Sequence, residues 1–385
     1  MADNKDKKVL NVPALRFPEF TDEWKEVLFA SNLERLENGA NYNTNDKDGV
    51  PMSRIETIST GRIDYTKVGH CSTPQKIEHY IMRYGDILFS HINSLKHIGK
   101  TAYYSAEEPL YHGMNLLLFR CKNNVDSKFF FFLINNTHFI RKCQILAKQA
   151  VNQASISTSD LKKIKVYIPD INEQSKIQKF LSLIEKRIEL QNKIIEDLKK
   201  LKSALYQEMF GSLVAPTLKL GQVAEIVKGK QVNGTELLEQ GDYYVMNGGT
   251  LPSGWLNNFN TEANTISISE GGNSCGYVQY NTSPYWSGGH CYSLKILHPK
   301  KTSDLYLYHF LKWQEENIMA LRIGSSLPNI QKKDLLRFPI ILPTITQQNK
   351  IVSILSAIEV NVSCEISITK YFIKQKEYLL GQLFI

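Results

Sequence analysis

The chain has 385 residues, of which 42% are hydrophobic and 22% are charged. This balance is ordinary for a folded protein and excludes general disorder, while the length predicts more than one domain. The formal net charge of +8 permits a polyanionic partner such as DNA but is too small to require one.

The cysteines and the apolar segments indicate a cytoplasmic protein with reduced thiols. Six cysteines lie far apart without a C-x-x-C pair, and the start, Met1–Lys8, is polar and charged. Even the aromatic run Phe129–Leu133 is short, and no apolar run approaches the roughly 20 residues that span a bilayer. We therefore expect no membrane partner.

The first part of the chain predicts a polar tail over residues 1–12 and a compact α+β domain over residues 13–170. Short apolar runs broken by Gly, Asn, Asp and Ser are typical of such a domain. Strands are expected at Ile87–Phe89, Ala102–Tyr104, Leu116–Phe119 and Ile164–Ile168, and a helix is expected around Lys128–Leu146.

A helical period follows over residues 171–212. Its apolar spacings alternate between four and three residues, the pattern of a coiled-coil seam. The seam residues are Ile177, Leu181, Ile184, Ile188, Ile195, Leu198, Leu205 and Met209, with polar breaks at Gln191 and Lys202.

A second domain is expected over residues 213–344. It begins with a predicted helix over Leu220–Gly229, after which glycine clusters separate strand-like pieces. These pieces are Thr265–Ser269, Tyr277–Tyr280 and Tyr292–Ile296. The glycine clusters match no phosphate-binding pattern and are interpreted as turns of a sheet.

Residues 345–385 predict a second long helix that repeats the first. Residues from Ile156 to Phe210 recur from Ile330 to Phe384, 174 residues later and without a gap. The second seam contains Ile351, Leu355, Ile358, Val362, Phe372, Leu379 and Leu383, with polar breaks at Glu365, Thr369 and Lys376. The two helices are alike, whereas the domains before them show little similarity.

Each helix is too long to be stable without a partner, and the other copy is the expected one. The polar seam positions Gln191 and Glu365 meet in an antiparallel pair, but a parallel pair matches them too, so they support the register more than the direction. Direction follows from topology: a repeat of domain and helix gains an approximate two-fold axis when the helices are antiparallel. The sequence thus predicts an α+β fold with two α/β domains separated by an antiparallel helical spacer.

Sequence motifs for catalysis are missing. The chain has no H-E-x-x-H, G-x-S-x-G or Asn/Asp-Pro-Pro-Tyr motif, and its nine histidines show no metal-ligand spacing. His290 and Cys291 are adjacent, but neighbouring residues on a strand face opposite sides, which argues against a thiol nucleophile and its base. We expect a non-catalytic chain that binds no metal or cofactor itself.

Several polar loops are candidates for DNA contacts, with an ordinary solvated turn as the alternative. The loop from Arg322 to Asn329 offers a guanidinium, hydroxyls and an amide, which suit phosphates and base edges. Its expected counterpart is Lys148–Ser155, and a second surface surrounds His91. The candidate residues are Ser90, His91, Asn93, Lys96, Lys100, Asn152, Gln153, Lys228, Lys230, Asn247, Arg322, Ser325, Ser326 and Asn329.

Several segments together resemble the specificity subunit of type I restriction–modification systems, over nearly the whole chain. They are Asn11–Phe20 with Trp24, Tyr84–Ser90, and Gly324–Ile330 followed by Asp334, Leu335 and Pro343. The first copy departs from the Gly-Ser-Ser-x-Pro form, with Asn152 to Ile156 in its place.

The resemblance implies that each variable domain reads one half of a split double-stranded DNA target, while the paired helices separate the half-sites. It further implies two docked methyltransferase subunits that methylate adenine, and endonuclease subunits that assemble through them. S-adenosylmethionine, ATP and Mg are then expected on those partners.

Two other hypotheses remain open from the residues alone. A protein-interaction scaffold would have the same two domains without DNA specificity. A nuclease would need a cluster of carboxylates and lysine around a metal, and the sequence shows none.

Overall fold

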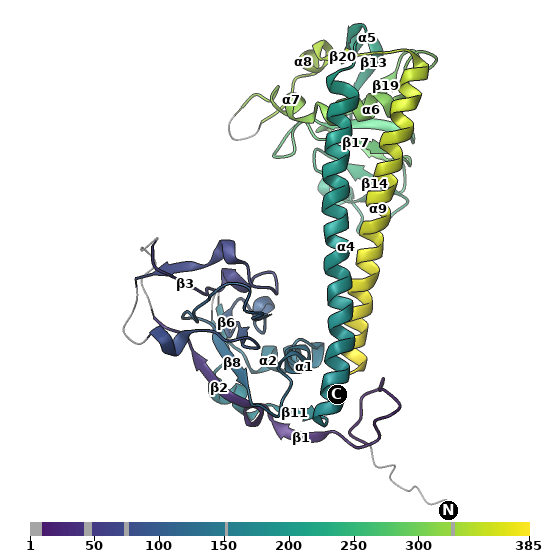
Figure 1. Ribbon diagram of the computed structural model, residues 1–385. Helices are drawn as coiled ribbons and strands as arrows, with labels where there is room; N and C mark the ends of the chain where they lie inside the picture. The colour runs from purple at the N-terminus through teal and green to yellow at the C-terminus, as the bar shows by residue number, and fades with distance from the viewer. Residues whose placement is uncertain (1–9, 42–47, 73–76, 151–152, 325–327) are drawn as a thin grey trace, which may run out of the picture. The chain divides into compact units, whose positions relative to one another are not determined.

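The computed structural model describes residues 10–41, 48–72, 77–150, 153–324 and 328–385 (Figure 1). It divides into two compact units. The first contains Met1–Gln191 and Ile368–Ile385, and the second contains Asn192–Ser367. Most of the predicted polar tail, residues 1–9, lies outside the described part.

The first unit is built on an antiparallel sheet with the order β2-β8-β5-β7. These strands are β2 (Leu33–Asn38), β8 (Leu117–Cys121), β5 (Ile87–Phe89) and β7 (Thr101–Tyr103). The smaller sheets are β1 (Lys25–Leu28) with β11 (Lys165–Ile168), β3 (Val50–Met52) with β4 (Gly69–Cys71), and β6 (Ile92–Asn93) with β10 (Gln153–Ser155) and β9 (Lys148–Ala150).

The second unit repeats this sheet with the order β13-β19-β16-β17. These strands are β13 (Ala224–Lys228), β19 (Cys291–Ile296), β16 (Thr265–Ser269) and β17 (Val278–Asn281). The smaller sheets are β12 (Thr217–Lys219) with β20 (Pro339–Ile341), and β14 (Tyr243–Met246) between β15 (Trp255–Leu256) and β18 (Trp286–Ser287). The two units therefore share one sheet topology although their sequences differ.

The helices also correspond between the units. In chain order, α1 (Ser127–Ile134), α2 (Thr137–Leu146) and α3 (Thr158–Lys163) correspond to α6 (Asp304–Trp313), α7 (Glu315–Met319) and α8 (Lys332–Arg337). The second unit has a further short helix, α5 (Leu220–Val223). The long helices are α4 (Ile171–Gly211) and α9 (Ile345–Gln382), and each is continuous from one unit into the other.

Two predicted helices differ from the structure. The segment Lys128–Leu146 is two helices, because Asn136 begins α2 and its side chain accepts a hydrogen bond from the Phe139 N–H. The segment Leu220–Gly229 is helical only over its first turn. Its remainder is strand β13, whose alternating burial of Ala224 and Ile226 follows the two-residue period of a strand.

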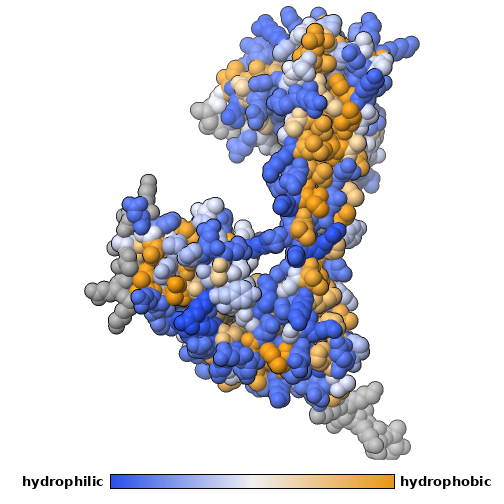
Figure 2. Space-filling model, viewed as in Figure 1, coloured by the Kyte–Doolittle hydropathy of each residue, from blue (hydrophilic) through white to orange (hydrophobic). Residues whose placement is uncertain are grey.

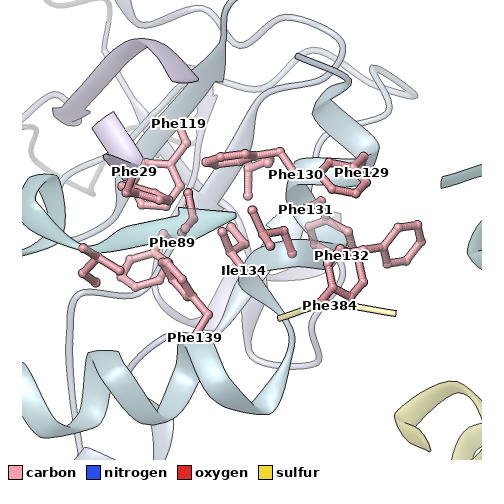
Figure 3. Close-up of a cluster of buried hydrophobic side chains, with 14 of the residues drawn as sticks. Phe29, Phe89, Phe119, Phe129, Phe130, Phe131, Phe132, Ile134, Phe139 and Phe384 are labelled. Atoms are coloured by element: carbon pink, nitrogen blue, oxygen red, sulfur yellow. The ribbon is translucent and has the colours of Figure 1, made fainter. Parts of the chain in front are cut away.

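The core of the first unit is rich in phenylalanine. Side chains from α1 pack on those of the sheet strands β5 and β8, as Figure 3 shows. Ile177 and Leu181 of α4 belong to the same buried cluster, and so do Leu379 and Leu383 of the second helical region. Both long helices are therefore part of this core and are not surface additions.

The phenylalanine that ends each copy of the repeat is buried in one unit. Phe384 is 3% exposed, with its ring centroid 5.5 Å from that of Phe129 and 6.3 Å from that of Trp24. Its repeat equivalent, Phe210, is 1% exposed in the second unit and stacks on Trp313 at 5.3 Å. Each long helix thus ends in the core of the unit where the other begins.

A glutamine repeated near the start of each long helix ties that helix to its unit. Its side-chain oxygen accepts the backbone N–H of the residue that caps α1 or α6, and its amide donates to a proline carbonyl. The partners are Asp126 and Pro169 for Gln174, and Ser303 and Pro343 for Gln348. The matching glutamines and prolines of the repeat are therefore explained by attachment of the helices.

Two equivalent ion pairs confirm that α4 and α9 are antiparallel. Lys376 lies 2.7 Å from Glu185 in the first unit, and Lys202 lies 2.6 Å from Glu359 in the second. The two glutamates are repeat equivalents, as are the two lysines, so each helix donates one charge of each sign. The predicted pairing of Gln191 with Glu365 would join the two units and stays a prediction.

Buried His309 should make the stability of the second unit depend on pH. Its Nδ1 lies 3.0 Å from the Tyr206 hydroxyl, and burial lowers its pKa from 6.5 to about 4 although nearby Glu359 opposes the shift. Because the unfolded chain takes up this proton near pH 6.5 and the folded chain only near pH 4, stability falls as the pH drops through this window.

The loss attributable to this ring is about 3 kcal/mol between pH 6.5 and pH 4. Urea unfolding of the wild type and of His309→Gln across this range measures it. The difference in unfolding free energy between the two proteins should shrink as the pH falls. A difference that stays constant with pH would show that His309 titrates normally in the folded protein.

Candidate nucleic-acid interface

Several loops of the second unit are joined at one end of its sheet. The His290 N–H donates to Asn247 Oδ1 at 3.1 Å, and the Glu270 N–H donates to the carbonyl of His290 at 2.9 Å. The Ile330 N–H in turn donates to the carbonyl of Glu270 at 2.8 Å. The predicted contact residue Asn247 therefore lies in one loop cluster with the segment that follows Arg322.

The segment from Arg322 to Asn329 forms a hairpin base. Ile323 and Asn329 exchange backbone hydrogen bonds of 2.8 and 3.0 Å, and the side chains of Arg322 and Asn329 are exposed. The predicted contacts Ser325 and Ser326 lie outside the described residues. The base of this hairpin thus presents a guanidinium and an amide to solvent.

The two predicted lysines of the second unit differ in their environment. Lys228 Nζ donates to Glu270 Oε1 at 2.8 Å, and the hydroxyl of Tyr292 donates to the same oxygen at 2.8 Å. Lys230 is exposed, and its backbone N–H is fixed by the carbonyl of Ser287 at 2.8 Å. Lys230 is therefore the stronger candidate for a phosphate contact, because Glu270 already compensates the charge of Lys228.

The predicted contacts of the first unit divide in the same way. Ser90 is buried, with its hydroxyl accepting from the Asn93 amide at 3.3 Å, and Lys100 Nζ donates to the carbonyl of Ser59 at 2.9 Å. Lys96 is exposed. The polar groups of Ser90 and Lys100 thus bond within the unit, and Lys96 is the exposed cation of this segment.

Strands β9 and β10 form the hairpin predicted as the counterpart of the Arg322 loop. Gln153 at its base is exposed, while Asn152 lies outside the described residues. Ser155 pairs with Ile92, and in the second unit Asn329 forms the equivalent antiparallel bridge with Gly271. Both hairpins therefore pair with the segment that directly follows the equivalent strand, β5 in the first unit and β16 in the second.

The backbone around Ser90 fixes this segment in the first unit. The Ser90 N–H donates to the carbonyl of Lys100 at 2.8 Å, and the Gly99 N–H donates to the carbonyl of Ser90 at 3.0 Å. Gly99 has a φ of 85°, which favours glycine. The carbonyl of the next residue, His91, accepts from the Ile156 N–H at 2.9 Å.

The backbone around Ser269 has the same arrangement in the second unit. The Ser269 N–H donates to the carbonyl of Tyr277 at 2.9 Å, and the Gly276 N–H donates to the carbonyl of Ser269 at 2.9 Å. Gly276 has a φ of 93°. Since Ile156 and Ile330 are repeat equivalents and bond to the residue after each serine, Glu270 occupies the place of His91.

Sequence reasoning named His91 but missed Glu270. A shared order of residues was the available signal. In both domains a serine lies at or directly after the end of a strand, a titratable residue comes next, and a loop glycine follows several positions later. The neighbouring pair His290 and Cys291 is no nucleophilic site, because His290 is exposed whereas Cys291 is buried and burial raises the pKa of its thiol to about 11.

Each unit also has a groove at the edge of its sheet. The groove lies between β7, α1 and α4 in the first unit and between β17, α6 and α9 in the second. The groove of the first unit encloses about 340 Å³ and that of the second about 730 Å³. The linings contain Tyr103, Phe131 and Glu185 in the first unit and Tyr280, Tyr308 and Glu359 in the second. The grooves are equivalent, although the residues on their rims differ.

Helix α9 exposes an unusual amount of apolar surface. By length and composition alone it could cross a membrane, with a mean hydropathy of 1.6 over its most apolar window and 17% of that window buried. Val360 is 66% exposed and Tyr371 is 74% exposed, and apolar surface gathers along the helix pair in Figure 2. The averaged hydropathy reveals this surface, although polar residues such as Glu359 and Glu365 keep each uninterrupted apolar run short.

Within the described ranges, no three His, Cys, Asp or Glu side chains come close enough together to hold a metal ion. The exposed groups of the loops are cations and amides, which are chemically suited to phosphates and base edges.

Comparison with known proteins identifies a family. The model of the type I restriction modification DNA specificity domain matches residues 26–200 and again residues 216–370. A protein of Methanocaldococcus jannaschii, named as the specificity subunit of the type I restriction enzyme MjaX, is 31% identical over 384 residues, covering 89% of this chain and 88% of its own length.

Solved structures share the fold at low identity. The type I restriction–modification S subunit from M. genitalium has a TM-score of 0.64 at 18% identity, covering 97% of this chain and 99% of its own. A chain from a study of complex assembly and conformational transition of the type I R-M system has a TM-score of 0.58 at 15% identity, covering 94% and 97%. The chain belongs to the family of type I restriction–modification specificity subunits.

Proposed function

We propose that this chain reads a bipartite target in double-stranded DNA and directs an adenine-N6 methyltransferase to it without catalysing the reaction. The observation that carries the proposal is the repetition of one sheet topology in two units whose loop residues differ. A shared scaffold with different side chains at equivalent positions is what two readers of different half-sites require.

The exposed cations at the loop ends support DNA as the ligand. Lys230 and Arg322 lie in the loop cluster of the second unit, and Lys96 lies in the first unit beside the segment that carries His91. Phosphate contacts supply affinity and orientation, while amides such as Asn93 and Asn329 suit base edges.

The equivalent grooves and the apolar surface of the helices support docking of two copies of one partner. We propose two methyltransferase subunits as these partners, with endonuclease subunits assembling through them. S-adenosylmethionine, ATP and Mg then bind to those subunits. Apolar patches of this kind are typical of protein interfaces. A protein partner on α9 would cover its apolar face in a cytoplasmic complex, so no membrane is needed to explain this surface.

The length of the long helices supports a spacer role. A helix of 41 residues, the length of α4, extends about 60 Å at 1.5 Å per residue, which is nearly two turns of DNA at about 34 Å each. Two readers connected by such helices would contact one duplex with a run of unread base pairs between them.

Sequencing of methylated bases in host DNA tests the proposal. Cells with this chain and its partner subunits should carry N6-methyladenine at one split motif, and deletion of this chain alone should remove that mark completely. An unchanged methylome after the deletion would favour the scaffold without DNA specificity.

A further inference from the structure

Each unit buries one titratable side chain at the equivalent point of its loop cluster. His91 is 6% exposed and Glu270 is 7% exposed. His91 Nδ1 and Glu270 Oε2 are both buried without a hydrogen-bond partner in the described part of the chain. Buried polar atoms nearly always have a partner, so an unpartnered one at the same place in both units points to a role in recognition.

The surroundings of Glu270 leave its carboxylate ready for a second donor. Its Oε1 accepts from the Tyr292 hydroxyl and from Lys228 Nζ, while Oε2 accepts from no described group. The side chain of Lys228 is 55% exposed, so this ammonium can turn toward a phosphate without unfolding the loop. Tyr292 would then hold the carboxylate in place.

His91 offers different chemistry in the same position. Burial lowers the pKa of His91 to about 4, so its ring is neutral near pH 7 and has one donor and one acceptor nitrogen. A carboxylate accepts hydrogen bonds only. The two positions therefore differ in what they can recognise, although the backbone around them is the same.

We propose that Glu270 and His91 are specificity-determining residues, each selecting a base pair in the half-site read by its own unit. Glu270 would accept from the exocyclic amine of cytosine or adenine in the major groove. The neutral imidazole of His91 would bond to a base edge that offers the complementary acceptor or donor. This inference rests on the proposed reading of a bipartite target.

The variant Glu270→Gln tests it with little change in shape. The amide oxygen can still accept from Tyr292 and Lys228, whereas the second carboxylate oxygen is replaced by an NH₂ group, which donates. The complete complex with its methyltransferase subunits would be assayed against a duplex library randomised in both half-sites. At one position of one half-site, the preference for a base pair should change at least tenfold, and the other half-site should keep its wild-type preferences.

The mirror variant His91→Gln should change the opposite half-site and leave the first unaltered. Among the described residues His91 has no ion-pair partner, so His91→Gln decides the question if Glu270→Gln fails to assemble. Glu262→Gln makes the same chemical change at an exposed site in the second unit and should leave both half-sites as in the wild type.

The outcomes separate this inference from the proposed function. A wild-type complex without a split motif would overturn the proposed function. A wild-type motif that stays the same in Glu270→Gln and in His91→Gln would overturn the specificity role alone. Uniformly weaker methylation with unchanged base preferences would assign both residues to structural support, which also overturns the inference.

Discussion

Inserting four residues into α4 between Ile188 and Ile195, with four more in the equivalent stretch Val362–Thr369 of α9, should lengthen the gap between the half-sites. Four residues extend a helix by about 6 Å, close to the rise of one or two base pairs. Because the loops that carry Glu270 and His91 are untouched, the half-site sequences should stay the same.

The paired insertion keeps the ion pairs of both units matched. Glu185 and Lys376 lie on one side of the insertions, and Lys202 and Glu359 lie on the other. Methylation sequencing of cells with the variant complex should show the wild-type half-sites separated by a gap that is longer by one or two base pairs.

The matched control inserts the same four residues after Gly211, in the connection that contains the 95% exposed Val214. That insertion lengthens the chain but not the helix, so the gap should keep its wild-type length. Altered half-sites with an unchanged gap in the helical variant would refute the spacer model.

The sequence predicted the helices well because their signal is local. The seam period depends only on neighbours within a few turns, and the continuous helices α4 and α9 cover both seams. A sequence pattern does not predict the contacts of several repeated residues. For example, Gln174 and Gln348 accept hydrogen bonds from the residues that cap α1 and α6. Those bonds join residues more than 40 positions apart.

The sequence did not reveal that the two domains have sheets of the same topology. Equivalent strands carry different side chains, such as Phe89 in β5 and Ile268 in β16. A comparison of the two amino-acid sequences therefore finds little similarity. Strand β13 was predicted as a helix because its Ala-Glu-Ile-Val-Lys run also fits a helical face, and only its pairing with β19 distinguishes the two.

The loop residues were the hardest to predict, because their roles depend on partners from other loops. Lys228 was predicted as a DNA contact, but its ammonium forms an ion pair with Glu270, which lies in another loop. Ser90 was predicted as a DNA contact, and it lies directly after β5, where it is buried. Composition suggested which residue types could contact DNA, and the fold decided which of them remain available.

Replacing Phe384 by alanine should destabilise the first unit by about 3–5 kcal/mol, although this residue lies nearly 200 positions beyond most of that unit. Its ring fills the space between Trp24 and Phe129, and truncation would leave a cavity there. The equivalent change Phe210→Ala should destabilise the second unit by a similar amount, since that ring packs on Trp313 and Phe310.

Hydrogen–deuterium exchange locates each effect. Amides of α1 should exchange faster in Phe384→Ala while those of α6 stay protected, and Phe210→Ala should show the reverse. Tyr371→Ala removes an aromatic ring that is 74% exposed on α9 and should alter the unfolding free energy by less than about 0.5 kcal/mol. Equal loss of protection in α1 and α6 from either phenylalanine variant would contradict the assignment of each ring to one unit, because each helix would then stabilise both units together.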